Sequence, residues 1–208
     1  DLFEKLKRDQ SVSNNAVIKK FYEELENQWF TEHDRLESKT KGERALTNWF
    51  DEYSNRWITN TLNEYRINDV LLSEDVRLVG VLDKMEFLGP NEVNVVDYKT
   101  GKPKTRNHIE GKTKDSTGDY YRQLVFYKLL LNLHAKGKYV FSSAEIDFIE
   151  PDDKDNMHKE KFVVPEDDVL DLKEQIMQVS DDILNLRFLD SECDPEKCDY
   201  CDLVDLVR

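Results

Sequence analysis

Residues 79–104 read VGVLDKMEFLGPNEVNVVDYKTGKPK, and this stretch carries most of the information about the fold. Two apolar runs that suit β-strands flank a Gly-Pro-Asn turn at residues 89–91. Asp83 lies in the first run, and Asp97 and Lys99 end the second. Alternate side chains of a strand share a face, so Asp97 and Lys99 should point to the same side of the sheet. If the strands pair through the turn, Asp83 approaches Asp97 at the sheet edge.

Two carboxylates and a lysine at the ends of buried strands have a chemical use. They can hold a divalent cation and activate water for attack on a phosphodiester. An Asp and a Lys two residues apart are more often a solvated salt bridge, so the neighbouring residues must decide. Val93, Val95 and Val96 form a nearly continuous apolar run, as in a strand buried on both faces. A charge in such a place is costly unless it is paired, and a metal ion is one possible partner.

Three motifs occur along the chain in a familiar order and spacing: Gly80-x-x-Asp83, then Asp97-Tyr98-Lys99-Thr100-Gly101, then Gln123-x-x-x-Tyr127. Together they resemble the signature of RecB-like nuclease domains of the PD-(D/E)xK superfamily. The resemblance covers roughly residues 60–135. It implies a restriction-endonuclease-like α/β core, with a mixed β-sheet flanked by helices. It also implies DNA cleavage and a link to UvrD-like helicases, to which such domains are commonly fused.

The resemblance implies a role for each motif residue of the two strands. Asp83 and Asp97 would be metal ligands, with the backbone carbonyl of Tyr98 as a third. Lys99 would orient or help to deprotonate the attacking water and stabilise charge that develops on the phosphate. These roles agree with the chemistry of a hard cation beside an ammonium group. Mg²⁺ is the expected ion and Mn²⁺ its substitute, because oxygen ligands suit both.

The third motif lies in the expected helix YYRQLVFYKLLLNL. Gln123 and Tyr127 are four residues apart and therefore share one face of that helix. Tyr127 is also compatible with a core aromatic packed among the neighbouring leucines. Gln123 is harder to explain by packing, and the resemblance places it beside the active site. Both are expected to belong to the catalytic residues.

The histidines depart from the family pattern. Many relatives carry a metal-binding histidine on an N-terminal helix, in a Gly-x-x-x-His setting. None of the histidines here, at positions 33, 108, 134 and 158, has that setting. The chain opens with DLFEKLKRDQ, which is typical of the middle of a helix. We therefore expect that the domain is cut from a longer protein and that the histidine precedes Asp1.

The cysteines are the second departure. Some relatives hold an iron–sulfur cluster whose last ligands follow the pattern C-x2-C-x5-C. Cys198 and Cys201 fit its first part, but Val207 stands at the next position, so a complete cluster is not expected. With Cys193 they could bind zinc if a fourth ligand came from elsewhere, although a metal-free remnant is favoured. An odd number of cysteines and no signal peptide favour a reducing, cytoplasmic setting.

Length and composition indicate one domain of 208 residues. We divide it into a helical part (1–64), a nuclease core (65–164) and a C-terminal helix with a cysteine-containing tail (165–208). No apolar stretch is long enough to cross a bilayer. The net charge of −14 is unusual for an enzyme that acts on DNA, because affinity for phosphates comes from Lys and Arg.

Basic residues gather beside the proposed site. Residues 99–114 hold six of them against one acid, whereas residues 190–205 hold seven acids against one lysine. The basic segment follows the catalytic strand directly and would focus positive potential there, although an ordinary solvated loop is the alternative. The candidate DNA contacts are Lys102, Lys104, Arg106, Lys112, Lys114 and Arg122.

Apolar periodicity predicts the other elements. Helical stripes run through residues 17–29 and 45–57, joined by a polar connection of uncertain structure. Three strands are expected over residues 65–99. Residues 101–118 form a long segment that is either functional or mobile.

A helix capped by Ser116 or Asp119 should follow this segment. After it we expect a hairpin over residues 140–164, and then a helix that opens at Pro165.

The main hypothesis is a metal-dependent deoxyribonuclease domain of a repair or recombination helicase–nuclease. Its expected substrate is single-stranded DNA, and its expected partner is a superfamily 1 helicase. The rival is a nuclease-like scaffold without activity that binds DNA or partner proteins. A zinc module at the cysteines that recruits partners is a weaker alternative. The intact set of Asp83, Asp97 and Lys99 favours the enzyme, because a scaffold has no need to retain it.

Overall fold

The computed structural model describes residues 2–8, 11–134 and 137–187. The chain divides into two compact units, Asp1–Val169 and Leu170–Arg208. The first unit contains all the strands among the described residues. The second contains most of α6 (Glu166–Leu184), which begins directly after Pro165 as predicted. The three cysteines lie outside the described residues.

In the described part of the chain, five strands form one sheet in the order β1-β2-β3-β4-β5. β2 pairs antiparallel with both β1 and β3, β4 pairs in parallel with β3, and β5 pairs antiparallel with β4. Their bounds are β1 (Thr61–Leu71), β2 (Arg77–Phe87), β3 (Glu92–Lys99), β4 (Val140–Phe148) and β5 (His158–Phe162). This mixed sheet with flanking helices confirms the predicted restriction-endonuclease-like α/β fold.

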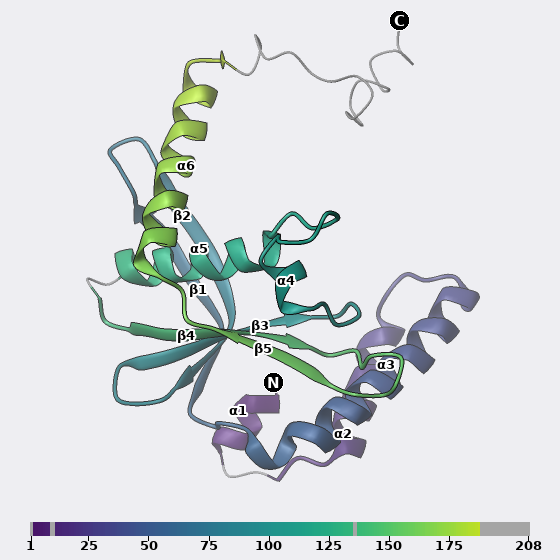
Figure 1. The fold of residues 1–208 in the computed structure, drawn as a ribbon. Coiled ribbons are helices and arrows are strands. Elements are labelled where there is room, and N and C mark those ends of the chain that lie inside the picture. Colours follow the sequence, from purple (N-terminus) through teal and green to yellow (C-terminus); the bar gives the residue numbers. More distant parts are fainter. Residues whose placement is uncertain (1, 9–10, 135–136, 188–208) are drawn as a thin grey trace, which may run out of the picture. The chain divides into compact units, whose positions relative to one another are not determined.

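The central strand β3 is buried on both faces, as its sequence predicts. Val93 and Val95 are completely buried, and Val96 is 1% exposed. Because β3 and β4 are parallel, the chain must cross over between them, and α5 (Asp119–Leu133) makes this crossing over one face of the sheet (Figure 1). A Cβ atom at Gly80 would lie 2.4 Å from Leu130 Cδ1. The glycine of the first motif therefore allows α5 to lie close to β2.

Helices α1 (Leu2–Lys7), α2 (Asn14–Glu26) and α3 (Glu32–Tyr53) precede the sheet, and a short 3-10 turn, η1 (Ser54–Arg56), follows α3. The polar segment that was expected to be a connection is the first half of α3. Thr31 starts this helix by accepting a hydrogen bond from the Asp34 N–H at 3.1 Å. Apolar periodicity is weak in this segment because much of its surface faces solvent.

Trp29 does not belong to the helical stripe predicted for it. Helix α2 ends at Glu26, and the Trp29 side chain is fully exposed. The spacing of four residues was therefore a coincidence at this position, because the chain leaves the helix before the next turn.

The prediction for the start of α5 is wrong in detail. Its cap residue is Gly118, with φ of 74°, and no side chain caps the helix. The Ser116 hydroxyl instead donates to the Thr113 carbonyl at 3.0 Å. A short helix, α4 (Arg106–Ile109), lies within the preceding segment, and the buried side chain of Ile109 fixes it to the core. Among the described residues, no helix combines the length and hydropathy needed to span a membrane.

Candidate active site

The β2–β3 register brings the first two motifs together. Lys84 pairs with Val96, and one further step of the same register sets Asp83 opposite Asp97. Asp83 Oδ2 accepts a hydrogen bond from the Tyr98 N–H at 3.0 Å. The carboxylate of β2 therefore holds the backbone of β3 directly beside Asp97.

Helix α5 adds the third motif and closes a ring of four side chains. Tyr127 OH donates to Asp97 Oδ1 at 2.9 Å, and Gln123 Nε2 donates to Tyr127 OH at 2.7 Å. Lys99 Nζ donates to Gln123 Oε1 at 2.6 Å and lies 2.6 Å from Asp97 Oδ2. The ring therefore joins two residues at the end of β3 to two residues one turn apart on α5.

Burial controls the protonation chemistry of this ring. Asp97 is 1% exposed, and this burial raises the pKa of its carboxyl, while the Lys99 ammonium opposes that shift. Burial also raises the pKa of Tyr127, and the nearby charge of Asp97 adds to the effect. Tyr127 is therefore a neutral hydroxyl that both donates and accepts a hydrogen bond.

The ring leaves one buried oxygen without a well-directed donor. Within the described residues, Asp97 Oδ2 accepts no hydrogen bond of good geometry, although the Lys99 ammonium is close to it. A buried carboxylate oxygen in this state is suited to a cation. Asp83 supplies a second carboxylate from the neighbouring strand.

This donor set fits Mg²⁺ better than a closed zinc site. Mg²⁺ is usually bound by one or two carboxylates together with waters and substrate phosphates. The described residues contain no group of three or more His, Cys, Asp or Glu side chains that could enclose a metal. Asp83 and Asp97 would therefore be the side chains that hold the ion. The Tyr98 carbonyl stays a predicted third ligand.

The match to a known family agrees with this geometry. The family model of the PD-(D/E)XK nuclease superfamily matches residues 2–206. The chain belongs to this superfamily. No curated protein matches the chain. PD-(D/E)XK proteins are generally nucleases, and a nuclease domain implies DNA as its substrate. They generally use divalent metals such as Mg²⁺.

One residue of this candidate site was missed in the sequence. Lys99 Nζ lies 4.6 Å from the centre of the Tyr120 ring, a cation–π contact that helps to hold the ammonium group. The signal was present, because Tyr120 stands three residues before Gln123 and seven before Tyr127 on the same helical face. The motif alone does not include it.

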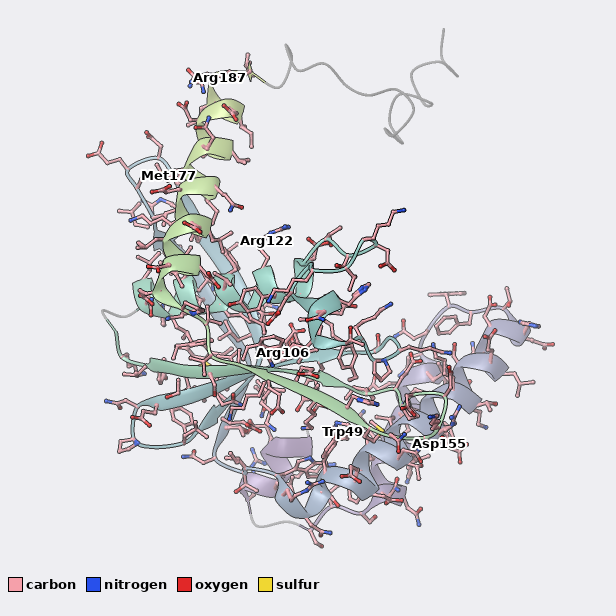
Figure 2. The ribbon with its side chains drawn as sticks, viewed as in Figure 1. Trp49, Arg106, Arg122, Asp155, Met177 and Arg187 are labelled. Carbon is pink, nitrogen blue, oxygen red and sulfur yellow. The ribbon has the colours of Figure 1, made fainter. Side chains whose placement is uncertain are left out.

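The basic residues beside the PD-(D/E)XK site do not form a bare positive patch. Several already contact carboxylates: Lys102 with Asp153, Arg106 with Glu110 and Glu160, Lys112 with Glu110, and Arg122 with Asp119. Figure 2 labels Arg106 and Arg122 on this part of the molecule. Lys104 lines a small cavity of about 140 Å³ together with His108 and Tyr120, and Lys114 is exposed. Their contact with DNA stays a prediction.

A second buried polar network supports the sheet from the side of α3. Trp49 packs edge-on against Tyr98, with 6.0 Å between ring centres, and its Nε1 lies 3.1 Å from each carboxylate oxygen of Asp147. Lys159 Nζ lies 2.7 Å from Asp147 Oδ2. Helix α3 thus contacts Tyr98, the residue that follows Asp97. It also reaches Asp147, which is 98 residues from Trp49 along the chain, a contact that periodicity could not indicate.

Proposed function

We propose that this PD-(D/E)XK domain is a metal-dependent deoxyribonuclease of the RecB-like type. The observation that carries the proposal is the hydrogen-bonded ring of Asp97, Tyr127, Gln123 and Lys99, with Asp83 on the adjacent strand. A buried carboxylate paired with a half-buried ammonium contributes little to stability once desolvation is counted. Their presence is better explained by chemistry on a phosphodiester.

The side chains divide the work of hydrolysis. A bound Mg²⁺ would polarise the scissile phosphate and lower the pKa of water. Lys99 lies where it can orient the attacking water and neutralise charge on the phosphate, because its ammonium is fixed between Asp97 and Gln123. Tyr127 orients Asp97 through its hydroxyl. The water oxygen bonds to phosphorus and the bond to the 3′-oxygen breaks, which leaves a 5′-phosphate and a 3′-hydroxyl.

Association with a superfamily 1 helicase in DNA repair or recombination is part of the same proposal. It rests on the resemblance of the three motifs to RecB-like domains. The pairing of Lys102, Arg106, Lys112 and Arg122 with acids supports it, because free DNA would bind weakly. A tethered helicase would raise the effective concentration of a single strand at the site.

The test compares cleavage of single-stranded and duplex DNA by the wild type and by Asp97→Asn, with Mg²⁺ or Mn²⁺. We expect the wild type to cut single strands and the variant to be at least about 100-fold slower. Asp75→Asn is the control, because it makes the same change on an exposed turn. Equal rates for the wild type and Asp97→Asn would refute the site. If neither protein cut DNA but both bound it, the scaffold alternative would be correct.

A further inference from the structure

A groove of about 640 Å³ lies between α3 and the connection from β4 to β5. Three cations line it: Lys41 and Arg44 on α3, and Lys102 from the segment after β3. The lining also holds four acids: Glu37, Glu150, Asp152 and Asp153. Lys102 is three residues beyond Lys99, so their Cα atoms are at most about 11 Å apart. In addition, the Ile149 N–H donates to the Lys99 carbonyl at 2.9 Å. A strand of DNA whose phosphate lies at Lys99 would therefore meet this groove at the edge of the sheet.

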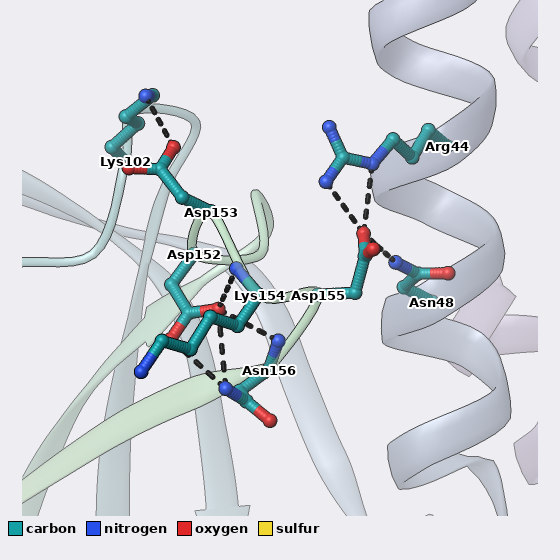
Figure 3. Close-up of polar contacts among 8 residues, drawn as sticks. All are labelled: Arg44, Asn48, Lys102, Asp152, Asp153, Lys154, Asp155 and Asn156. Carbon is teal, nitrogen blue, oxygen red and sulfur yellow. Dashed lines mark hydrogen bonds and ion pairs between the residues drawn. The ribbon is translucent and has the colours of Figure 1, made fainter.

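Arg44 is held by a carboxylate of the β4–β5 connection. Its Nε and Nη2 lie 2.9 Å and 2.5 Å from Asp155 Oδ1, and Asn48 donates to the same oxygen at 3.3 Å (Figure 3). A guanidinium group with an amide beside it is also a good receptor for a phosphate oxygen. Asp155 thus occupies the position that a phosphate would take.

The other two cations are held by the same connection. Lys41 Nζ lies 2.9 Å from Glu150 Oε1, and Lys102 Nζ lies 2.7 Å from Asp153 Oδ1. Each of the three cations that line the groove is thus paired with an acid from residues 150–155. Asp153 and Asp155 belong to the exposed stretch of this connection, whereas the Glu150 side chain is only 11% exposed.

The conformation of residues 150–155 places their carboxylates beside the cations. Asp152 folds this segment locally by accepting hydrogen bonds from the N–H groups of Lys154 and Asn156, at 2.8 Å and 2.9 Å (Figure 3). Asp153 and Asp155 then project toward their cations on either side. Asp153 is 85% exposed and Asp155 is 61% exposed. Ion pairs as exposed as these contribute little to stability, so another anion can replace the carboxylates.

We propose that this groove binds the sugar–phosphate backbone of a DNA strand next to the scissile bond. Phosphates replace Asp153 on Lys102 and Asp155 on Arg44, and Lys41, which is 61% exposed, lines the same groove. The acidic segment thus competes with DNA for its own binding site. The inference rests on the proposed nuclease function, because that function supplies the polyanionic ligand. A domain with a net charge of −14 should bind DNA weakly as long as its own carboxylates occupy these cations.

The test measures binding of a fluorescent oligothymidine by anisotropy in EDTA, where metal-dependent cleavage cannot proceed. We expect Arg44→Gln and Lys41→Gln to raise Kd at least threefold over the control Lys19→Gln. Lys19 is 79% exposed on α2, so this control makes the same charge change away from the groove. The slope of log Kd against log salt should fall by about 0.7 for each lost phosphate contact.

Substitution of the acidic partners should change Kd in the opposite direction, which a merely structural role would not produce. We expect Asp155→Asn and Asp153→Asn each to lower Kd severalfold, and more than the control Asp75→Asn, which changes the net charge equally. Equal effects in the control, or weaker binding in Asp155→Asn, would overturn the proposal. Binding of a fluorescent oligolysine that Asp155→Asn abolishes would point to a basic peptide instead.

The failure of this inference is distinguishable from failure of the nuclease proposal. Cleavage in Mg²⁺ by the wild type and Asp97→Asn tests the nuclease proposal, whereas binding of oligothymidine in EDTA by the Arg44, Lys41 and Asp155 variants tests the groove. Loss of cleavage in Asp97→Asn, together with a raised Kd for oligothymidine in Arg44→Gln, would support both proposals. A wild type that cuts DNA while Arg44, Lys41 and Asp155 substitutions leave Kd unchanged would refute the groove alone.

Discussion

The Tyr127 hydroxyl shows how a residue of the core can also belong to the site. Its ring is buried on α5, yet its hydroxyl lies between Gln123 and Asp97 and contacts both. Burial raises the pKa of this phenol, so it remains a donor to the carboxylate. The packing and catalytic interpretations of Tyr127 are therefore compatible, because they concern different atoms of one side chain.

Tyr127→Phe should separate these two contributions. The ring would still pack, but Asp97 Oδ1 and Gln123 Nε2 would each lose a partner. We expect the free energy of unfolding to fall by about 1–3 kcal/mol. Mg²⁺-dependent cleavage should fall by about tenfold or more, because the carboxylate is no longer oriented. Urea unfolding and a cleavage assay measure the two effects.

Tyr121→Phe is a matched control on the same helix. Tyr121 OH donates to Asp168 Oδ2 at 2.5 Å, so the variant also loses a hydrogen bond to a carboxylate. It should lose stability but keep its cleavage rate. An equal loss of cleavage in both variants would show that Tyr127 acts on stability alone.

At the scale of elements, the connection from β3 to α5 decides where the third motif begins. Gly111 and Gly118 both have φ of 74°, and a Cβ at Gly111 would lie 3.0 Å from the backbone of Gly118. This close approach turns the chain into α5 without a side-chain cap. Tyr120 and Gln123 follow at once on the first turns of the helix.

Gly111→Ala should therefore destabilise the domain. Left-handed backbone costs an alanine about 1–2 kcal/mol, and the contact with the Gly118 backbone adds to this cost. Gly101→Ala is the control, because a Cβ at that glycine meets nothing within 4 Å. Urea unfolding of both variants should show a clear loss for Gly111→Ala and little change for Gly101→Ala. Equal stability of the two would contradict the close approach.

At the scale of the whole first unit, one buried carboxyl should couple stability to pH. Asp147 on β4 is 1% exposed, and burial raises its pKa to about 6. The Lys159 ammonium and the Trp49 N–H oppose this shift, while Glu145 adds to it; Lys84 is a further charge of this network. The folded state therefore binds a proton more tightly than the unfolded state, in which the pKa is near 3.8.

Because Asp147 has the higher pKa when folded, its contribution to stability falls as pH rises from about 4 to about 6. Relative to Asp147→Asn, the wild type should lose up to about 3 kcal/mol of unfolding free energy over this range. Urea unfolding from pH 4 to 7.5 tests this expectation, with Asp75→Asn as the exposed control. A difference between wild type and Asp147→Asn that is constant with pH would contradict it.

Much of the fold could be predicted because it is encoded in local patterns. The valine run of β3 and the apolar helix of the third motif reflect the burial of neighbouring residues. The turn at residues 89–91 is encoded by its Gly-Pro-Asn residues. The first half of α3 and the cap of α5 could not be predicted in this way. The polar surface of α3 carries little periodic signal, and Gly118 starts α5 through backbone contact with Gly111 rather than through a side chain.

Sequence motifs were sufficient to predict the superfamily, the order of the core elements and the positions of Asp83, Asp97 and Lys99 on paired strands. These properties depend on residue type and short spacing, which a chain displays before it folds. Only the tertiary structure decided the ring from Asp97 to Gln123, the support of Tyr98 by Trp49, and the pairing of Arg44 with Asp155. The last of these joins residues 111 positions apart. Such contacts depend on where β-strand register and helix packing bring distant side chains together.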